Sequence, residues 1–133
     1  MIHEEICTYE VAKLAKEKEF PQHIGDDAYI VENEYDDKYE VGCHYPIQFI
    51  PDYLPNITAP TQSLLQRWLR EEKGVIVEVF VDDDSNMPLT YNIHQYKDWN
   101  WECVCHHHGN YYAISDWELA LEDALKYTLE NFV

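Results

Sequence analysis

The stretch VIVEVFVDDDSNMPLTYNIHQYKDWNWECVC, residues 75–105, decides the fold of this chain. It contains three runs rich in β-branched and aromatic residues, at 75–81, 89–96 and 99–105. Such runs are typical of strands. Two short turn-forming segments, 82–86 and 97–98, separate them, and short turns between consecutive strands favour antiparallel hairpins. We therefore predict a three-stranded antiparallel sheet.

A helix is expected before the sheet, over residues 60–73. Pro60 suits the first helical turn, where its missing N–H costs nothing, and Gly74 suits a left-handed stop. The apolar stripe of this helix has 3–4 spacing and consists of Leu64, Leu65, Trp68 and Leu69.

A further helix is predicted after the sheet, from residue 115 to 132. Ser115 and Glu118 fit a capping box, and Ile114 with Leu119 fits a hydrophobic staple around it. The order over residues 60–132 is therefore α-β-β-β-α. We predict an α+β fold in which both helices pack on one face of an antiparallel sheet.

The first 57 residues are expected to add to this unit within a single domain, 1–133. Thr8 can cap a helix that ends at Phe20-Pro21, and residues 28–33 and 39–44 resemble two short strands. Four prolines from Pro46 to Pro60 favour an extended arm, because each fixes φ and lacks an N–H donor. The chain is thus divided into 1–57 and the α-β-β-β-α unit, 58–133.

The chain of 133 residues carries a net charge of −17, spread over both halves. Charge of this sign repels nucleic-acid backbones and anionic lipid surfaces, so we expect neither a nucleic-acid nor a membrane partner. The double-stranded-RNA-binding domain shares the α-β-β-β-α order. It needs a cationic last helix, however, whereas residues 115–133 hold five acids and one lysine.

The location of the protein is expected to be cytoplasmic. No apolar run approaches the roughly 20 residues of a membrane span. Residues 1–9 contain acids and no basic residue, unlike the start of a signal peptide. The cysteines at positions 7, 43, 103 and 105 are accordingly interpreted as reduced thiols.

The candidate chemical site consists of histidines and carboxylates on one sheet face. If the strands pair as simple hairpins, that face carries Glu78, His94, Glu102 and His106, with His108 nearby. Such a set could bind zinc or a similar metal, or serve as an acid–base pair. It could equally be a solvated face with scattered polar residues, so no cofactor is assigned.

The opposite face of the sheet is expected to be core. Strand alternation places on it Trp99, Trp101, Cys103 and Cys105. Segment 103–108, CVCHHH, contains the residue types that ligate zinc, but a C-x-C pair without a second pair does not match a zinc finger. We interpret both cysteines as buried.

Other catalytic and binding motifs do not occur in the sequence. Asp82, Asp84 and Asn86 begin a calcium-loop pattern, but Met87 and Ile93 stand where glycine and glutamate are required. Nucleophile elbow, P-loop and zinc-protease motifs are missing. We assign no catalytic residue and expect a protein that is not an enzyme.

The aromatic content suggests a function through binding. Eleven tyrosines and four tryptophans fill cores, but such rings also form protein-binding surfaces. The leading hypothesis is a non-enzymatic interaction protein whose acidic, aromatic surface binds a basic protein. Two alternatives stay open: a DNA mimic that inhibits a nucleic-acid enzyme, and a metal-dependent enzyme using the histidine–glutamate face. Homodimerisation through the proline-rich arm or a sheet edge is also open.

Three segments carry a resemblance to a known family: EEICTYEVAKLAKEKEF (4–20), APTQSLLQRWLREEKGVIVEVFV (59–81) and SDWELALEDALKYTLENFV (115–133). APTQ leading into WLRE is the most specific part. The chain resembles small uncharacterised proteins of gut Bacteroidetes and their phages and prophages, a family with no assigned function. The resemblance implies a bacterial or phage-borne cytoplasmic accessory protein and no catalytic residue.

Overall fold

The computed structural model of the chain describes residues 5–22, 28–32, 39–41, 56–82, 85–106 and 110–133. They belong to two compact units, Met1–Gln62 and Ser63–Val133, and each is described by itself. Several residues considered above lie outside the described ones, namely Pro46, Pro51, Pro55, Cys43, Asp84, His107 and His108.

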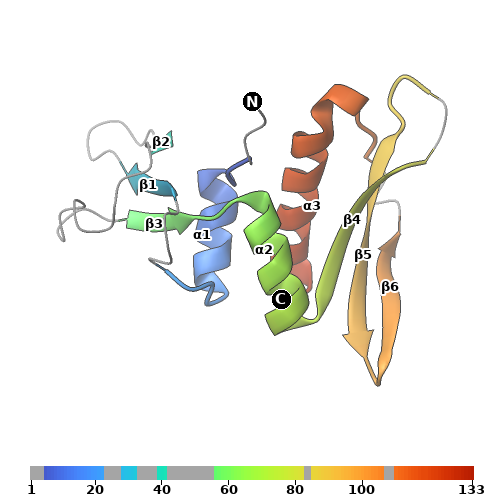
Figure 1. Cartoon of the computed structure of the whole chain (residues 1–133), viewed down its shortest axis with the longest axis horizontal. Coiled ribbons are helices and arrows are strands. Elements are labelled where there is room, and N and C mark those ends of the chain that lie inside the picture. Colours follow the sequence, from blue (N-terminus) through green and yellow to red (C-terminus); the bar gives the residue numbers. More distant parts are fainter. Residues whose placement is uncertain (1–4, 23–27, 33–38, 42–55, 83–84, 107–109) are drawn as a thin grey trace. The chain divides into compact units, whose positions relative to one another are not determined.

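The described residues of the first unit form the helix α1 (Tyr9–Glu17) and a three-stranded sheet (Figure 1). The sheet order is β2 (Tyr39–Val41), β1 (Ala28–Glu32), β3 (Asn56–Ala59), with both neighbouring pairs antiparallel. Both strands expected between residues 28 and 44 are present, and the end of the proline-rich segment forms β3.

Local hydrogen bonds set both ends of α1. The predicted cap is confirmed, because the backbone N–H of Val11 donates to Oγ1 of Thr8 at 3.3 Å. At the other end Glu19 is left-handed, with φ 71°. The N–H of Phe20 donates to the carbonyl of Ala15 at 2.9 Å. This is the Schellman arrangement, with glutamate where glycine is usual.

The second unit contains the predicted α-β-β-β-α order, and the α+β class is confirmed. Its elements are α2 (Gln62–Trp68), a π-helical turn (Leu69–Lys73), β4 (Val75–Val81), β5 (Leu89–Lys97), β6 (Asn100–His106), a 3₁₀ turn (Ile114–Asp116) and α3 (Trp117–Asn131). The strands form an antiparallel sheet in the order β4-β5-β6.

The core of this unit lies between α3 and the sheet. α3 packs against β4 and β5 (Figure 1). The side chains of Val77 and Ile93 pair across the two strands and are buried, as are Leu125 and Leu129 of the helix. We call this side of the sheet the covered face, and the side away from α3 the open face.

Gly74 makes the turn from the π-helical segment into β4. Its φ of 65° confirms the predicted left-handed stop. Its carbonyl accepts a hydrogen bond from the N–H of Tyr96 at 2.9 Å, which ties the turn to β5.

Two predicted helix starts are wrong. α2 begins at Gln62 and not at Pro60, because residues 56–59 form β3 and Pro60 lies between that strand and the helix. α3 begins at Trp117 after a 3₁₀ turn in which the N–H of Asp116 donates to the carbonyl of Ala113 at 2.9 Å. Ser115 lies inside that turn and cannot act as the cap. The expected staple residues are both exposed.

Candidate functional site

The β5–β6 hairpin turns through two residues, Asp98 and Trp99, whose φ angles are 50° and 68°. Lys97 and Asn100 pair on either side of them. Two consecutive left-handed residues are typical of a type I′ turn, in which glycine is usual at the second position. Aspartate tolerates this conformation, whereas a bulky residue pays roughly 1–2 kcal/mol. Trp99 therefore occupies a strained position.

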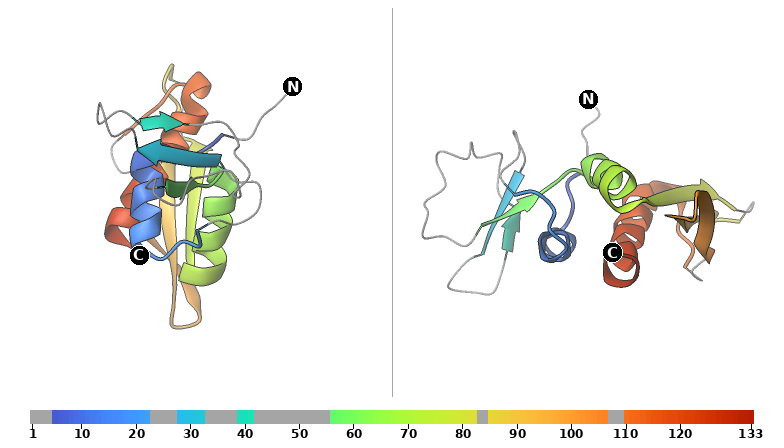
Figure 2. Two further views of the ribbon diagram at one scale, coloured as in Figure 1. Left: turned by 90° about the vertical axis from the view of Figure 1, so that its left-hand side faces the viewer. Right: turned by 90° about the horizontal axis from the view of Figure 1, so that it is seen from below.

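Three aromatic side chains gather at this turn, and we call them the aromatic tip: Tyr96, Trp99 and Trp101. Their exposed fractions are 43%, 89% and 47%. The rings of Tyr96 and Trp101, paired across the strands, lie 5.3 Å apart between centroids and are tilted by 55°. The hairpin extends beyond the ends of α2 and α3 (Figures 1 and 2). The tip thus presents apolar rings to solvent.

A polar pair follows the aromatic tip along the open face. Nε2 of His94 lies 3.1 Å from Oε2 of Glu78, within hydrogen-bonding distance. The Glu78 side chain is 53% exposed. Among the described strand residues that the register assigns to this face, Glu78 is the only Asp, Glu, Lys or Arg.

The other two candidate metal ligands are placed differently by the register. His106 pairs with Asn92, which lies on the open face beside Glu78. Glu102 pairs with Gln95 and lies on the opposite side. Within the described part of the chain, no three His, Cys, Asp or Glu side chains form a group that could hold a metal ion. The structure therefore brings together one pair, Glu78 and His94.

The predicted core face of β6 is wrong for three of its four members. Trp99 lies in the turn, while Trp101 and Cys103 lie on the open face and are exposed. The two-residue turn sets this register. A bulge at Val104 then restores Cys105 to the covered side, opposite Ile93, where it is partly buried and not fully buried as expected. Burial raises the pKa of the Cys105 thiol, and the neighbouring Cys103 adds to the effect, so Cys105 is not activated as a nucleophile.

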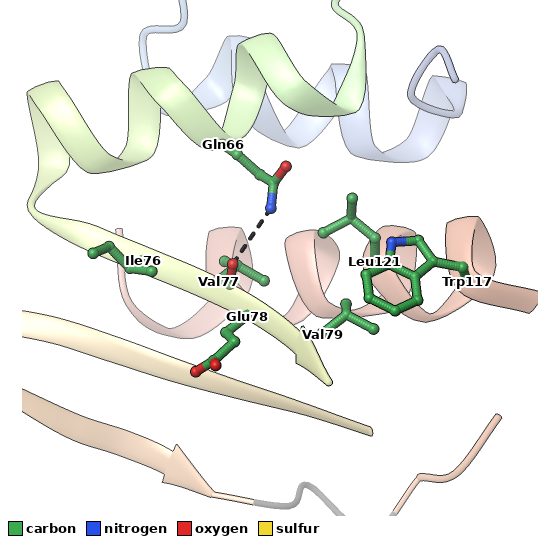
Figure 3. Close-up of a pocket in the computed structure, with 7 residues that line it drawn as sticks. All are labelled: Gln66, Ile76, Val77, Glu78, Val79, Trp117 and Leu121. Atoms are coloured by element: carbon green, nitrogen blue, oxygen red, sulfur yellow. Dashed lines mark hydrogen bonds between the residues drawn. The ribbon is translucent and has the colours of Figure 1, made fainter. Parts of the chain in front are cut away.

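A groove of about 300 Å³ lies where α2 and α3 meet β4 (Figure 3). The side-chain Nε2 of Gln66 donates to the carbonyl of Val77 at 3.3 Å. Trp117 and Leu121 line the other side. The carboxylate of Glu78 points away from both Gln66 and Trp117 (Figure 3). The groove is therefore lined by apolar groups and by the amide of Gln66, which hydrogen-bonds to the edge of β4. The described residues that line it present no side chains placed for acid–base chemistry.

A smaller hollow of about 220 Å³ lies between β5 and α3, lined by Tyr91, Asn110, Asp123, Lys126, Tyr127 and Glu130. Burial is the main cause that raises the pKa of Tyr91 to about 12. The pKa of Tyr112 is raised further, by burial and by Asp123, to whose Oδ2 its hydroxyl donates at 2.7 Å. Both phenols stay protonated at neutral pH and serve as structural hydrogen-bonding groups.

Comparison of the chain with protein-family models, curated proteins and solved structures finds no match. The helices of the described residues include none with the length and apolar character that crossing a membrane requires.

Proposed function

We propose that the protein is a non-enzymatic interaction protein that binds a basic protein partner through the aromatic tip and the adjoining open face. The single observation that carries the proposal is the exposure of Trp99 and Trp101 on a hairpin that projects beyond the helices. Tryptophan and tyrosine dominate the binding energy of protein interfaces, because they bury much area with few rotatable bonds.

The charge of the second unit supports a basic partner. Residues 63–133 contain thirteen acidic and five basic side chains, a net charge of −8. A field of this sign accelerates association with cationic surfaces and opposes anionic ones. On the open face, the exposed Glu78 carboxylate offers a cationic partner a negatively charged hydrogen-bond acceptor.

The resemblance to small proteins of Bacteroidetes and their phages supports an accessory role in the bacterial cytoplasm. We propose that the protein acts by occupying a partner. That mode of action needs a projecting surface and no catalytic group.

Affinity capture with the tagged full-length chain tests this function. The bait is exposed to a gut Bacteroidetes lysate and compared with a Trp99→Ala/Trp101→Ala variant and with Trp117→Ala, a control 42% exposed in the wild type. We expect the wild type and the control to retain the same basic protein and the double variant to lose it. Equal retention by all three baits contradicts the proposal, as does retention of no specific protein.

A further inference from the structure

We infer that the aromatic tip binds an arginine side chain, and that the open face takes an extended partner segment with basic residues at alternate positions. This inference rests on the proposed function and names the chemistry of its partner. It follows from the rings of the aromatic tip, the position of Glu78 and the form of β6.

Arginine suits the aromatic tip better than lysine. A guanidinium is planar, weakly hydrated and always charged, so it stacks on tryptophan and tyrosine faces. Trp99, at 89% exposure, has most of its surface available to a ligand. No Lys or Arg occurs among the described strand residues of the open face, so no basic side chain of that face competes for the rings.

The spacing along the sheet predicts a second basic residue. The row of Tyr96 and Trp101 is followed, two residues along β5, by His94. Nε2 of His94 lies 3.1 Å from Oε2 of Glu78, which itself pairs with Asn92, two residues farther along. Two residues of a strand rise about 7 Å, the same as alternate residues of an extended ligand. A segment that places arginine on the rings of Tyr96 and Trp101 therefore brings its next-but-one side chain to His94 and to the Glu78 carboxylate beside it.

The form of β6 favours recognition by side chains over strand addition. No strand pairs with its outer edge among the described residues. The bulge at Val104, however, breaks the regular pairing of that strand. Bulges are among the devices by which edge strands avoid pairing with another chain.

The probe for this inference is a short acetylated and amidated peptide with arginine at two alternate positions and glycine elsewhere. Its citrulline analogue keeps the shape and hydrogen-bonding groups but lacks the charge. Binding to the full chain is followed by NMR through the four tryptophan indole N–H signals. We expect the arginine peptide to shift the signals of Trp99 and Trp101 and to leave Trp68 and Trp117 unchanged.

Variants then locate the contact. Trp99→Phe, which keeps a ring, is expected to retain binding within a small factor, whereas Trp99→Gly weakens it about tenfold. Equal binding of the citrulline peptide, equal shifts at Trp117, or unchanged affinity of Trp99→Gly overturns the inference. If the lysate partner depends on Trp99 and Trp101 but the arginine peptide does not bind, the inference fails while the proposed function stands.

Discussion

The two faces of the β4–β5–β6 sheet differ in what their side chains do for the fold. On the covered face Val77 and Ile93 are buried, as is Leu125 of α3, which packs against that face, whereas Val81 at the end of β4 is exposed. On the open side Trp99 and Trp101 are exposed, and Trp99 also requires an unfavourable backbone conformation. The covered face is explained by folding, whereas we attribute the exposure of the aromatic tip to the binding function proposed above.

Truncating the covered face should give the largest effect. Leu125→Ala removes a fully buried side chain and leaves a cavity, so we expect a loss of about 3 kcal/mol in the free energy of unfolding. Leu119→Ala is the matched control on the same helix, where the side chain is 51% exposed. It should cost well under 1 kcal/mol in the same urea titration. Equal losses would contradict the assignment of the covered face.

Alkaline pH should lower the free energy of unfolding through the buried phenol of Tyr91. The pKa of Tyr91 rises on folding from about 10 to about 12, so the folded state favours the protonated form. The stability that results is fully present below pH 10 and is lost as pH rises toward 12. Denaturation midpoints measured across this range should fall, and Tyr91→Phe should flatten the fall. An identical slope in the variant would exclude this cause.

The left-handed turn at Gly74 provides a backbone test. A Cβ added there would meet Cβ of Tyr96 at 3.5 Å, an ordinary contact, so the cost comes from φ alone. Gly74→Ala should lower the free energy of unfolding by about 1 kcal/mol. The reverse change at a similar φ, Glu19→Gly, should not destabilise its own helix end. If Gly74→Ala left the free energy of unfolding unchanged, the backbone of this turn would have to relax to another conformation.

The arrangement of elements was predictable because apolar periodicity and breakers recur clearly. Local sequence features predicted strands at 75–81 and 89–96 and a helix end at Gly74. In the structure, the bounds of β4 and β5 and this helix end lie within one residue of those positions. The last helix shows apolar 3–4 spacing too, and in α3 Ala120, Leu121, Ala124 and Leu125 are buried.

The register was not predictable, because it depends on single residues. A two-residue turn at Asp98-Trp99 moves Glu102 off the open face, and the Val104 bulge reverses the parity again before Cys105. Neither feature has a strong sequence signal, since Trp99 stands where a type I′ turn ordinarily has glycine. The aromatic tip could have been suspected only from the number of rings around residues 96–101.

The most direct test of the account is the stability of Trp99→Gly, with Trp99→Ala as the control that removes the ring but keeps a Cβ. Because the ring of Trp99 is 89% exposed and the turn is left-handed, the glycine variant should gain roughly 0.5–1 kcal/mol in the free energy of unfolding, and the alanine variant should gain much less. A glycine variant less stable than the wild type would show that Trp99 supports the fold, and would contradict its assignment as a binding residue.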